Sequence, residues 1–167
     1  MTGVCRATRE SQFNKGGVMI DYQRIFHNGF LVPDIEVAKK EMGASLGVTW
    51  ANSWSYEPMS YWTPAGKAEA NLTVTYSKQG PQHVELIQGT GFWASKPGVG
   101  IHHIGVWTDN LAADANALVK EGWVPEASLL SPQEGWGRFC YIRPPSGGMR
   151  LELVSTEIKE LMESRWA

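Results

Sequence analysis

Four residues of the sequence have side chains of the types that bind divalent metal ions. His27 and His103 lie in short apolar runs, and Glu85 and Glu152 lie in the apolar segments HVELI and RLELV. A carboxylate is costly to bury without a partner, so a glutamate within an apolar strand indicates a compensating positive group. Two imidazoles and two carboxylates around one divalent ion would supply that compensation. Nitrogen and oxygen ligands without sulfur disfavour a closed structural zinc site and suit Zn, Ni, Co, Mn or Fe with water in open positions.

These four residues occupy matching places in two similar halves of the chain. His27 and His103 are 76 residues apart, and the same offset relates the glycines two positions after each of them. Glu85 and Glu152 are 67 residues apart. Similarity at a fixed offset is typical of an internal repeat. A single histidine or strand glutamate is more often structural than functional, so it is the duplication that favours a metal site.

Each half predicts a strand at its start and an antiparallel hairpin at its end. Residues 24–32 and 100–108 are β-branched and aromatic, which is typical of strands. Residues 72–87 and 139–154 each contain two apolar runs around a turn rich in Gly, Pro and Ser, a pattern typical of β-hairpins. The combination of these strands with helices predicts an α+β fold.

Helix signals follow the first strand of each half. Asp34 and Asn110 are N-cap residue types, and apolar residues follow them at helical spacing. Gly47 and Gly122 are natural helix ends. A further helix is expected near the C-terminus, with Thr156 as its N-cap.

Strand periodicity places the glycines beside the candidate ligands. His27 shares a strand face with Gly29, and His103 shares one with Gly105. If the histidines point inward, the glycines leave space beside the ion. In this register His102 points to the opposite face. A slip of one residue would exchange His102 for His103, so the choice between them stays open.

The content of aromatic residues is high, with 8 Trp, 5 Tyr and 5 Phe. Several of them lie in residues 50–62, a polar stretch that we interpret as a loop-like wall or lid of an aromatic-lined cleft. Other candidates share a strand face with the ligands, and among these Arg150 would hold a substrate carboxylate. The candidate substrate-binding residues are Trp50, Trp54, Tyr61, Trp62, His83, Trp107 and Arg150.

Length and charge restrict the class of protein. The 167 residues suffice for one compact domain, and the net charge of −2 lacks the basic excess that attracts nucleic acid or anionic membranes. No apolar run approaches the roughly 20 residues that a bilayer requires. Residues 1–20 lack the apolar stretch of a secretion signal. We therefore expect a cytoplasmic protein whose partner is a small molecule.

The sequence resembles the vicinal oxygen chelate superfamily, in its glyoxalase I and methylmalonyl-CoA epimerase branch. The segments that carry the resemblance are HNGFLVPDIEVA, HVELIQG, GIHHIGVWTDNLAA and PPSGGMRLELV, in that order. The resemblance implies two βαβββ modules in tandem that form a curled mixed sheet around a metal-bearing cleft. It also implies one divalent metal ion, with His27, Glu85, His103 and Glu152 at the four ligand positions.

The resemblance implies an isomerase, epimerase or lyase that enolises a carbonyl substrate by proton transfer from an adjacent carbon. The metal would stabilise the oxyanion, Glu152 would accept the proton, and Glu85 would serve the opposite face. Tyr76, Tyr141 and His83 are further candidate proton carriers. Two alternatives stay open, namely an Fe(II) or Mn(II) ring-cleaving dioxygenase and a metal-free small-molecule binding or resistance module.

Two departures from the family pattern leave the substrate unspecified. Leu31 stands where glyoxalase I has a basic residue for glutathione, and residues 72–79 lack the second catalytic glutamate of the epimerases. The expected domain organisation is a flexible N-terminal extension followed by one domain, and we expect the protein to form a homodimer. Its ranges are 1–20 for the extension, 21–167 for the domain, about 21–92 and 100–155 for its two modules, and 156–167 for the C-terminal helix.

Overall fold

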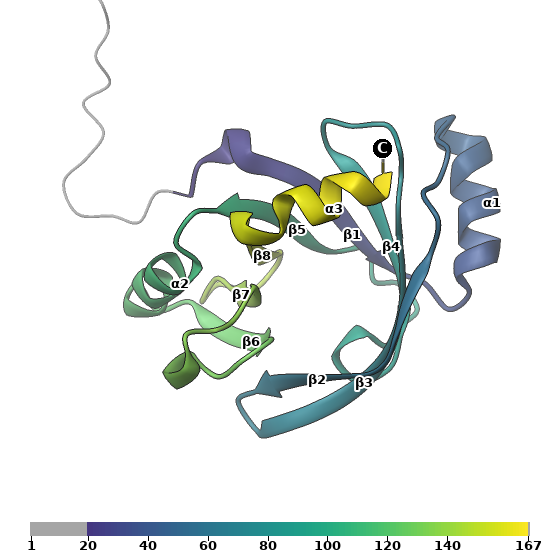
Figure 1. The fold of residues 1–167 in the computed structure, drawn as a ribbon. Helices are drawn as coiled ribbons and strands as arrows, with labels where there is room; N and C mark the ends of the chain where they lie inside the picture. Colours follow the sequence, from purple (N-terminus) through teal and green to yellow (C-terminus); the bar gives the residue numbers. More distant parts are fainter. Residues whose placement is uncertain (1–19, 167) are drawn as a thin grey trace, which may run out of the picture.

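The computed structural model describes residues 20–166, which contain the βαβββ order twice (Figure 1). The first module comprises β1 (Ile25–Leu31), α1 (Ile35–Leu46), β2 (Trp54–Thr63), β3 (Gly66–Tyr76) and β4 (His83–Gly89). The second comprises β5 (Ile101–Thr108), α2 (Leu111–Lys120), β6 (Val124–Ser128), β7 (Phe139–Arg143) and β8 (Arg150–Ser155), and α3 (Lys159–Trp166) follows it. Short 3-10 helices are formed by Tyr22–Arg24, Gly91–Trp93, Pro132–Glu134 and Thr156–Ile158. The predicted fold class is confirmed, whereas residues 1–19 of the predicted flexible extension lie outside the described residues.

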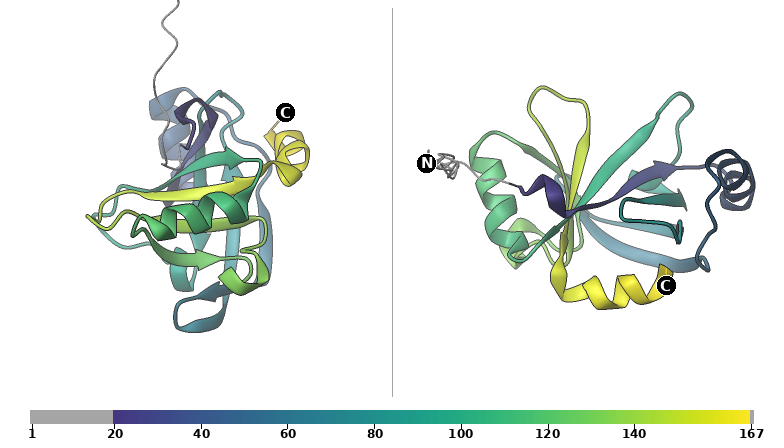
Figure 2. Two further views of the ribbon diagram at one scale, coloured as in Figure 1. Left: turned by 90° about the vertical axis from the view of Figure 1, so that its left-hand side faces the viewer. Right: turned by 90° about the horizontal axis from the view of Figure 1, so that it is seen from above.

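The strands form one curled, closed sheet in the order β1-β4-β3-β2-β6-β7-β8-β5. The modules join through β1 and β5, which are antiparallel, while β1–β4 and β5–β8 are parallel pairs. On the other side the closure is narrow, because β2 and β6 share a single residue pair, Trp62 with Ser128. Figure 2 shows α1 and α2 outside the sheet at opposite ends of the molecule.

The two longer helices begin where the sequence predicts and cover the outer face of the sheet. The Asp34 side chain accepts hydrogen bonds from two backbone amides of α1, and Asn110 accepts one from α2. Gly47 ends α1 in the left-handed conformation with φ 69°. In α1, Ile35 packs with Leu86 of β4 in an outer apolar cluster. The inner face of the sheet is thereby left free for a site.

Two local predictions were wrong. Residues 50–62 are not a loop, because Trp54–Thr63 form strand β2, which pairs along most of its length with β3, although residues of this strand do form part of a cavity wall, as the sequence predicts. Its polar residues reflect a largely exposed strand, not a loop. The N-cap after β8 is Ser155 instead of Thr156, since the Ser155 hydroxyl accepts a hydrogen bond from a backbone amide two residues later. Among residues 20–166, no helix is long and apolar enough to cross a membrane.

Candidate metal centre

Strand pairing brings the four candidate ligands together where the two modules meet. Gly29 and Gly105 each have two pairing partners in the sheet, one on each neighbouring strand. One partner is a histidine of the other module, and the second is a glutamate of the same module. The pairs are Gly29 with His103 and Glu85, and Gly105 with His27 and Glu152. Because pairing partners point to the same face of a sheet, all four side chains lie on the inner face.

The two imidazoles occupy the space that side chains at Gly29 and Gly105 would need. A Cβ added at Gly29 would lie 1.9 Å from Cε1 of His103, and one at Gly105 would lie 1.9 Å from Cε1 of His27. Such distances are far inside van der Waals contact. The glycines therefore permit both rings to cross the β1–β5 junction.

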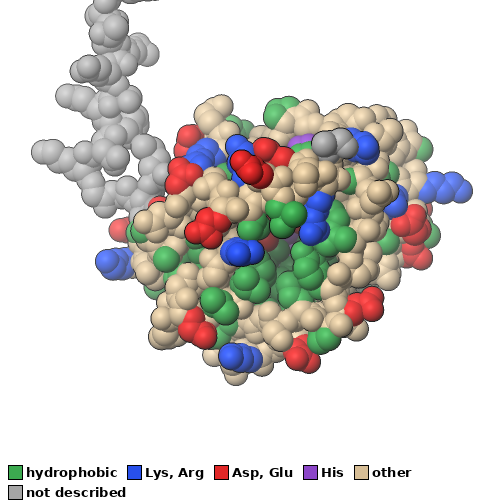
Figure 3. Space-filling model, in the orientation of Figure 1, with side chains coloured by type: hydrophobic (Ala, Val, Ile, Leu, Met, Phe, Trp, Pro, Cys, Tyr) green, Lys and Arg blue, Asp and Glu red, His purple; other side chains and the backbone are tan. Residues whose placement is uncertain are grey.

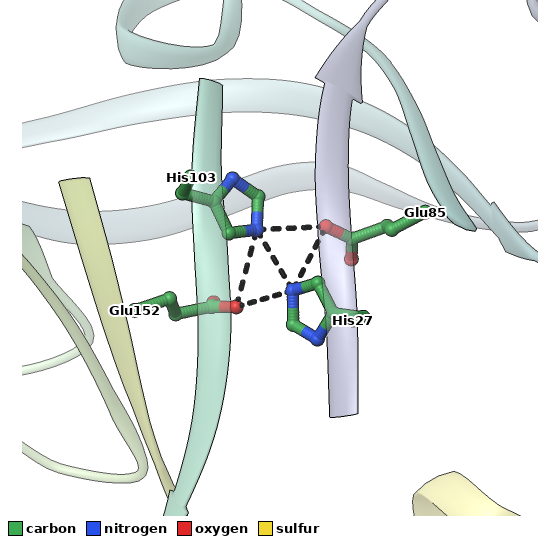
Figure 4. Close-up of side chains that lie close together, drawn as sticks. All are labelled: His27, Glu85, His103 and Glu152. Carbon is green, nitrogen blue, oxygen red and sulfur yellow. Dashed lines mark hydrogen bonds and ion pairs between the residues drawn. The ribbon is translucent and has the colours of Figure 1, made fainter. Parts of the chain in front are cut away.

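The ligand atoms of the four residues form a compact cluster (Figure 4). One atom from each residue lies within 4.8 Å of all the others. Nε2 of His27 lies 3.0 Å from Oε2 of Glu152 and 3.4 Å from Oε2 of Glu85. Nε2 of His103 lies 2.9 Å from Oε2 of Glu85 and 3.3 Å from Oε2 of Glu152. The two Nε2 atoms are 2.8 Å apart, so all four groups point to one centre.

His102 is not part of the cluster. Its Nδ1 atom lies 3.0 Å from Nδ1 of His103, on the side of that ring away from the cluster. Burial, together with the charges of His103 and Arg150, lowers the pKa of His102 to about 3. His102 is therefore neutral and can accept a hydrogen bond from Nδ1 of His103, which leaves Nε2 of His103 available as a ligand.

The cluster is buried, so its charged groups need partners of opposite charge. His27 and His103 have no exposed surface, and Glu85 and Glu152 are buried. Burial alone would lower the pKa of His103, but the hydrogen bonds and charges of Glu152 and Glu85 outweigh it and raise the pKa to about 9. Burial alone would raise the pKa of Glu152, but hydrogen bonds from His103 and His27 hold it well below its usual range. The Glu152 carboxylate is thus kept charged, and it requires positive charge beside it.

The donor set fits a divalent ion. Two buried atoms of the cluster are poorly satisfied: Nδ1 of His27 makes no hydrogen bond, and Oε2 of Glu85 receives none from outside the cluster. Oε2 of Glu85 also faces Nε2 of both histidines. An ion bound by both Nε2 atoms and one oxygen of each glutamate would satisfy this oxygen and supply the positive charge. Zn, Ni, Co, Mn and Fe all accept imidazole and carboxylate ligands.

Two tyrosines lie beside the glutamates. The Tyr76 hydroxyl donates a hydrogen bond to Oε1 of Glu85 and so holds that carboxylate in place. Burial and the charges of Glu85 and Glu152 raise the pKa of Tyr76 and Tyr141 well above the ordinary value. Both phenols are therefore neutral and can donate hydrogen bonds, but they are poor proton acceptors. The third candidate proton carrier, His83, lies outside the lining of the cavity onto which both tyrosines face.

Glu85 and Glu152 open onto a cavity of about 480 Å³. Ligand sites in proteins usually have volumes of about 300–1,000 Å³, so the cavity suits a small molecule. Figure 3 shows a hollow whose visible surface is mainly hydrophobic, with Lys and Arg side chains at its edge. Apolar and aromatic residues of the lining are Phe26, Trp54, Tyr56, Pro58, Met59, Leu72, Val74, Tyr76, Ile87, Trp93, Leu129, Phe139, Tyr141, Val154, Ile158, Leu161 and Met162.

Of the seven candidate substrate-binding residues, Trp54 lines this cavity. The other six lie outside the lining: Trp50, Tyr61, Trp62, His83, Trp107 and Arg150. Most of them have internal partners. The Trp50 indole donates to the Lys39 carbonyl, and Trp107 stacks behind the cavity residue Phe26. Arg150 donates to the Glu126 carboxylate, so its charge is already compensated.

Part of the cavity wall comes from the C-terminal segment, which we did not select as a site from the sequence. Ile158, Leu161, Met162 and Arg165 all line the cavity. The spacing of the three apolar residues is that of one helix face, and this signal could have identified the wall. Phe26, next to His27 of the cluster, gives no comparable signal, because its orientation depends on how β1 is paired.

Comparisons with known proteins identify the family. The family model described as "Glyoxalase/Bleomycin resistance protein/Dioxygenase superfamily" matches residues 26–141, which is more than half of the chain. The protein belongs to this superfamily, and the resemblance inferred from the sequence is confirmed. No curated protein sequence matches the chain significantly.

Solved structures of methylmalonyl-CoA epimerases share the fold. An epimerase in complex with methylmalonyl-CoA is 20% identical, with 79% of this chain and 93% of the other covered and a TM-score of 0.53. The epimerase from Mycobacterium tuberculosis is 15% identical, with 90% and 97% covered and a TM-score of 0.55. A variant of the Streptomyces coelicolor epimerase, bound to 2-nitronate-propionyl-CoA, is 21% identical, with 79% and 93% covered and a TM-score of 0.53. At these identities the likeness concerns the fold alone.

Proposed function

We propose that this protein is a divalent-metal-dependent isomerase, epimerase or lyase that enolises a small carbonyl substrate. The observation that carries the proposal is the buried cluster of His27, Glu85, His103 and Glu152, whose two glutamates open onto an apolar cavity. The superfamily assignment supports a metal-dependent reaction. Methylmalonyl-CoA epimerases are among the proteins that share this protein's fold, and epimerisation is one of the reactions proposed.

A divalent ion held by the four ligands would supply a Lewis acid for a substrate oxygen that gains negative charge. The protein's own groups would move the proton. Glu152 is the proposed base, because its carboxylate belongs to the cluster and faces the cavity. Glu85, held by Tyr76, would serve the opposite face of the substrate. The apolar residues of the lining would limit the access of water to the reacting carbon.

Metal content is the first test. Native protein is reconstituted with Zn, Ni, Co, Mn and Fe in turn, and the bound metal is measured by elemental analysis. We expect about one ion per chain. The variant Glu152→Ala should lose the ion, whereas Glu41→Ala should retain it because Glu41 is exposed on α1. Equal metal content in the two variants, or no stoichiometric metal with any of the five ions, would refute the proposed metal site.

Exchange of substrate hydrogen with solvent tests the reaction type. The loaded protein is incubated in deuterium oxide with 2-oxoacids, acyl thioesters and hemithioacetals, and deuterium incorporation is followed by NMR. Incorporation that depends on Glu152 would support enolisation. Oxygen uptake with catechols and no exchange would instead support a ring-cleaving dioxygenase.

The homodimer and the cytoplasmic location stay predictions. Sedimentation velocity would measure whether the protein is a dimer.

A further inference from the structure

The cavity lining carries four charged residues, and they are divided into two pairs of opposite sign. Glu85 and Glu152 belong to the cluster with the histidines. Arg138 and Arg165 are the two positive residues of the lining. An anionic group of a bound molecule would be repelled by the glutamates and attracted by the arginines.

Arg165 is held in the cavity wall with an unused hydrogen-bond donor. It belongs to α3, and its guanidinium lies over the ring of Trp54 of β2, with Cζ 4.2 Å from the ring centroid. Stacking covers one face of the guanidinium and leaves its N–H edge free. Nη1 of Arg165 is buried and has no hydrogen-bond partner. A buried donor without an acceptor is unfavourable, and a ligand oxygen would satisfy it.

Neither cavity arginine has a carboxylate partner among residues 20–166, in contrast to three other arginines of the fold. Arg24 forms an ion pair with Asp109, and Arg143 and Arg150 both pair with Glu126. Arg138 comes from the second module, just before β7, and is exposed at the cavity. The arginines that face away from the cavity are thus neutralised, and those that line it are not.

We propose that Arg165, assisted by Arg138, binds the anionic group of the substrate, and that the substrate is an organic acid with an apolar, preferably aromatic, body. The planar guanidinium edge suits a carboxylate, which can accept two parallel hydrogen bonds. The stacked rings of Trp54 and Tyr76, which lead from Arg165 to Glu85, suit a flat apolar body. The anionic end lies at the arginines, and the reacting carbon lies at Glu85 and Glu152. This inference rests on the proposed function, since it specifies the substrate class of the same site.

A pair of probes that differ only in charge tests the inference. Naphthalene-2-carboxylate and naphthalene-2-carboxamide are titrated into zinc-loaded protein and into EDTA-treated protein, and their affinities are measured by calorimetry. In native protein the carboxylate should bind about tenfold more tightly than the amide. In Arg165→Gln this ratio should fall to within about twofold, and in Arg165→Lys it should be intermediate. The control Arg24→Gln removes an arginine that does not line the cavity and should keep the native ratio.

The two protein preparations separate this inference from the proposed function. A preference for the carboxylate that persists in EDTA-treated protein and is lost in Arg165→Gln arises from the arginine, because no metal is then bound and the histidines are unchanged. Loss of metal binding or of hydrogen exchange would refute the proposed function and leave that preference intact. The inference itself is refuted by equal affinities in native protein, by a preference seen only with zinc, by an unchanged ratio in Arg165→Gln, or by the failure of both probes to bind.

Discussion

At the scale of single residues, Gly29 and Gly105 determine where the two buried imidazoles can lie. Each ring passes over the glycine of the opposite module, at the position that a Cβ would occupy. Both Nε2 atoms thereby reach the centre of the cluster. The absence of a side chain at these two glycines therefore helps to set the orientation of the rings, together with the side chains that surround each ring.

The variants Gly29→Ala and Gly105→Ala should weaken metal binding by about 10–100-fold, the range usual for changes that disturb the orientation of a ligand. The reason is that the new methyl group forces His103 or His27 away from the cluster. Affinity is measured by competition with a chromophoric chelator. Gly100→Ala is a matched control, because no atom lies within 4 Å of a Cβ at that position. Native affinity in all three variants would contradict this account of the glycines.

Metal binding should also release a proton from His103. Its pKa of about 9 without metal means that it carries a proton at pH 7. A metal ligand must be unprotonated, so binding should release about one proton per ion at pH 7 and almost none from this group well above pH 9. Glu152 contributes no proton at pH 7, because its pKa is lowered. Calorimetry in buffers of different ionisation enthalpy measures the release, and a release that is the same at pH 7 and pH 10 would contradict the prediction.

At the scale of elements, the sequence predicted most of the features that local rules decide, and the N-cap after β8 is an exception. The N-caps Asp34 and Asn110, the αL end at Gly47 and the paired hairpins all follow from short-range preferences. The internal repeat added long-range information, since matching positions in two modules come together across β1 and β5. That is why the four members of the cluster could be selected before the fold was known.

The cavity wall was less accessible to prediction because it depends on contacts between distant elements. The partner of Arg150 is Glu126, which reaches it through the pairing of β6, β7 and β8. From the sequence, Arg150 therefore resembled a free cation in the pocket. The cavity cation Arg165 lies on α3, outside the segments that carry the four residues of the cluster, and only the packing of α3 against β2 places it in the cavity wall.

At the scale of the whole molecule, the cluster joins two modules whose strand pairing is much more extensive on one side of the closed sheet than on the other. Each module supplies one histidine and one glutamate. The modules pair extensively through β1 and β5, but β2 and β6 share a single residue pair. A bound ion would add four bonds across the β1–β5 junction and would stabilise the folded state, which alone brings the ligands together.

Metal should therefore raise the thermal stability of the entire domain. At a free zinc concentration of 100 times the dissociation constant, the added stability is about 2.7 kcal/mol. For a chain of this size, that corresponds to a rise in Tm of about 5–10 °C. Differential scanning calorimetry with and without zinc measures it. Glu85→Ala and Glu152→Ala should abolish the rise, while Glu41→Ala should keep it, since Glu41 is exposed on the outer helix α1. An equal rise in Glu152→Ala and Glu41→Ala would mean that zinc stabilises the fold from another place, and the four residues would then not be its ligands.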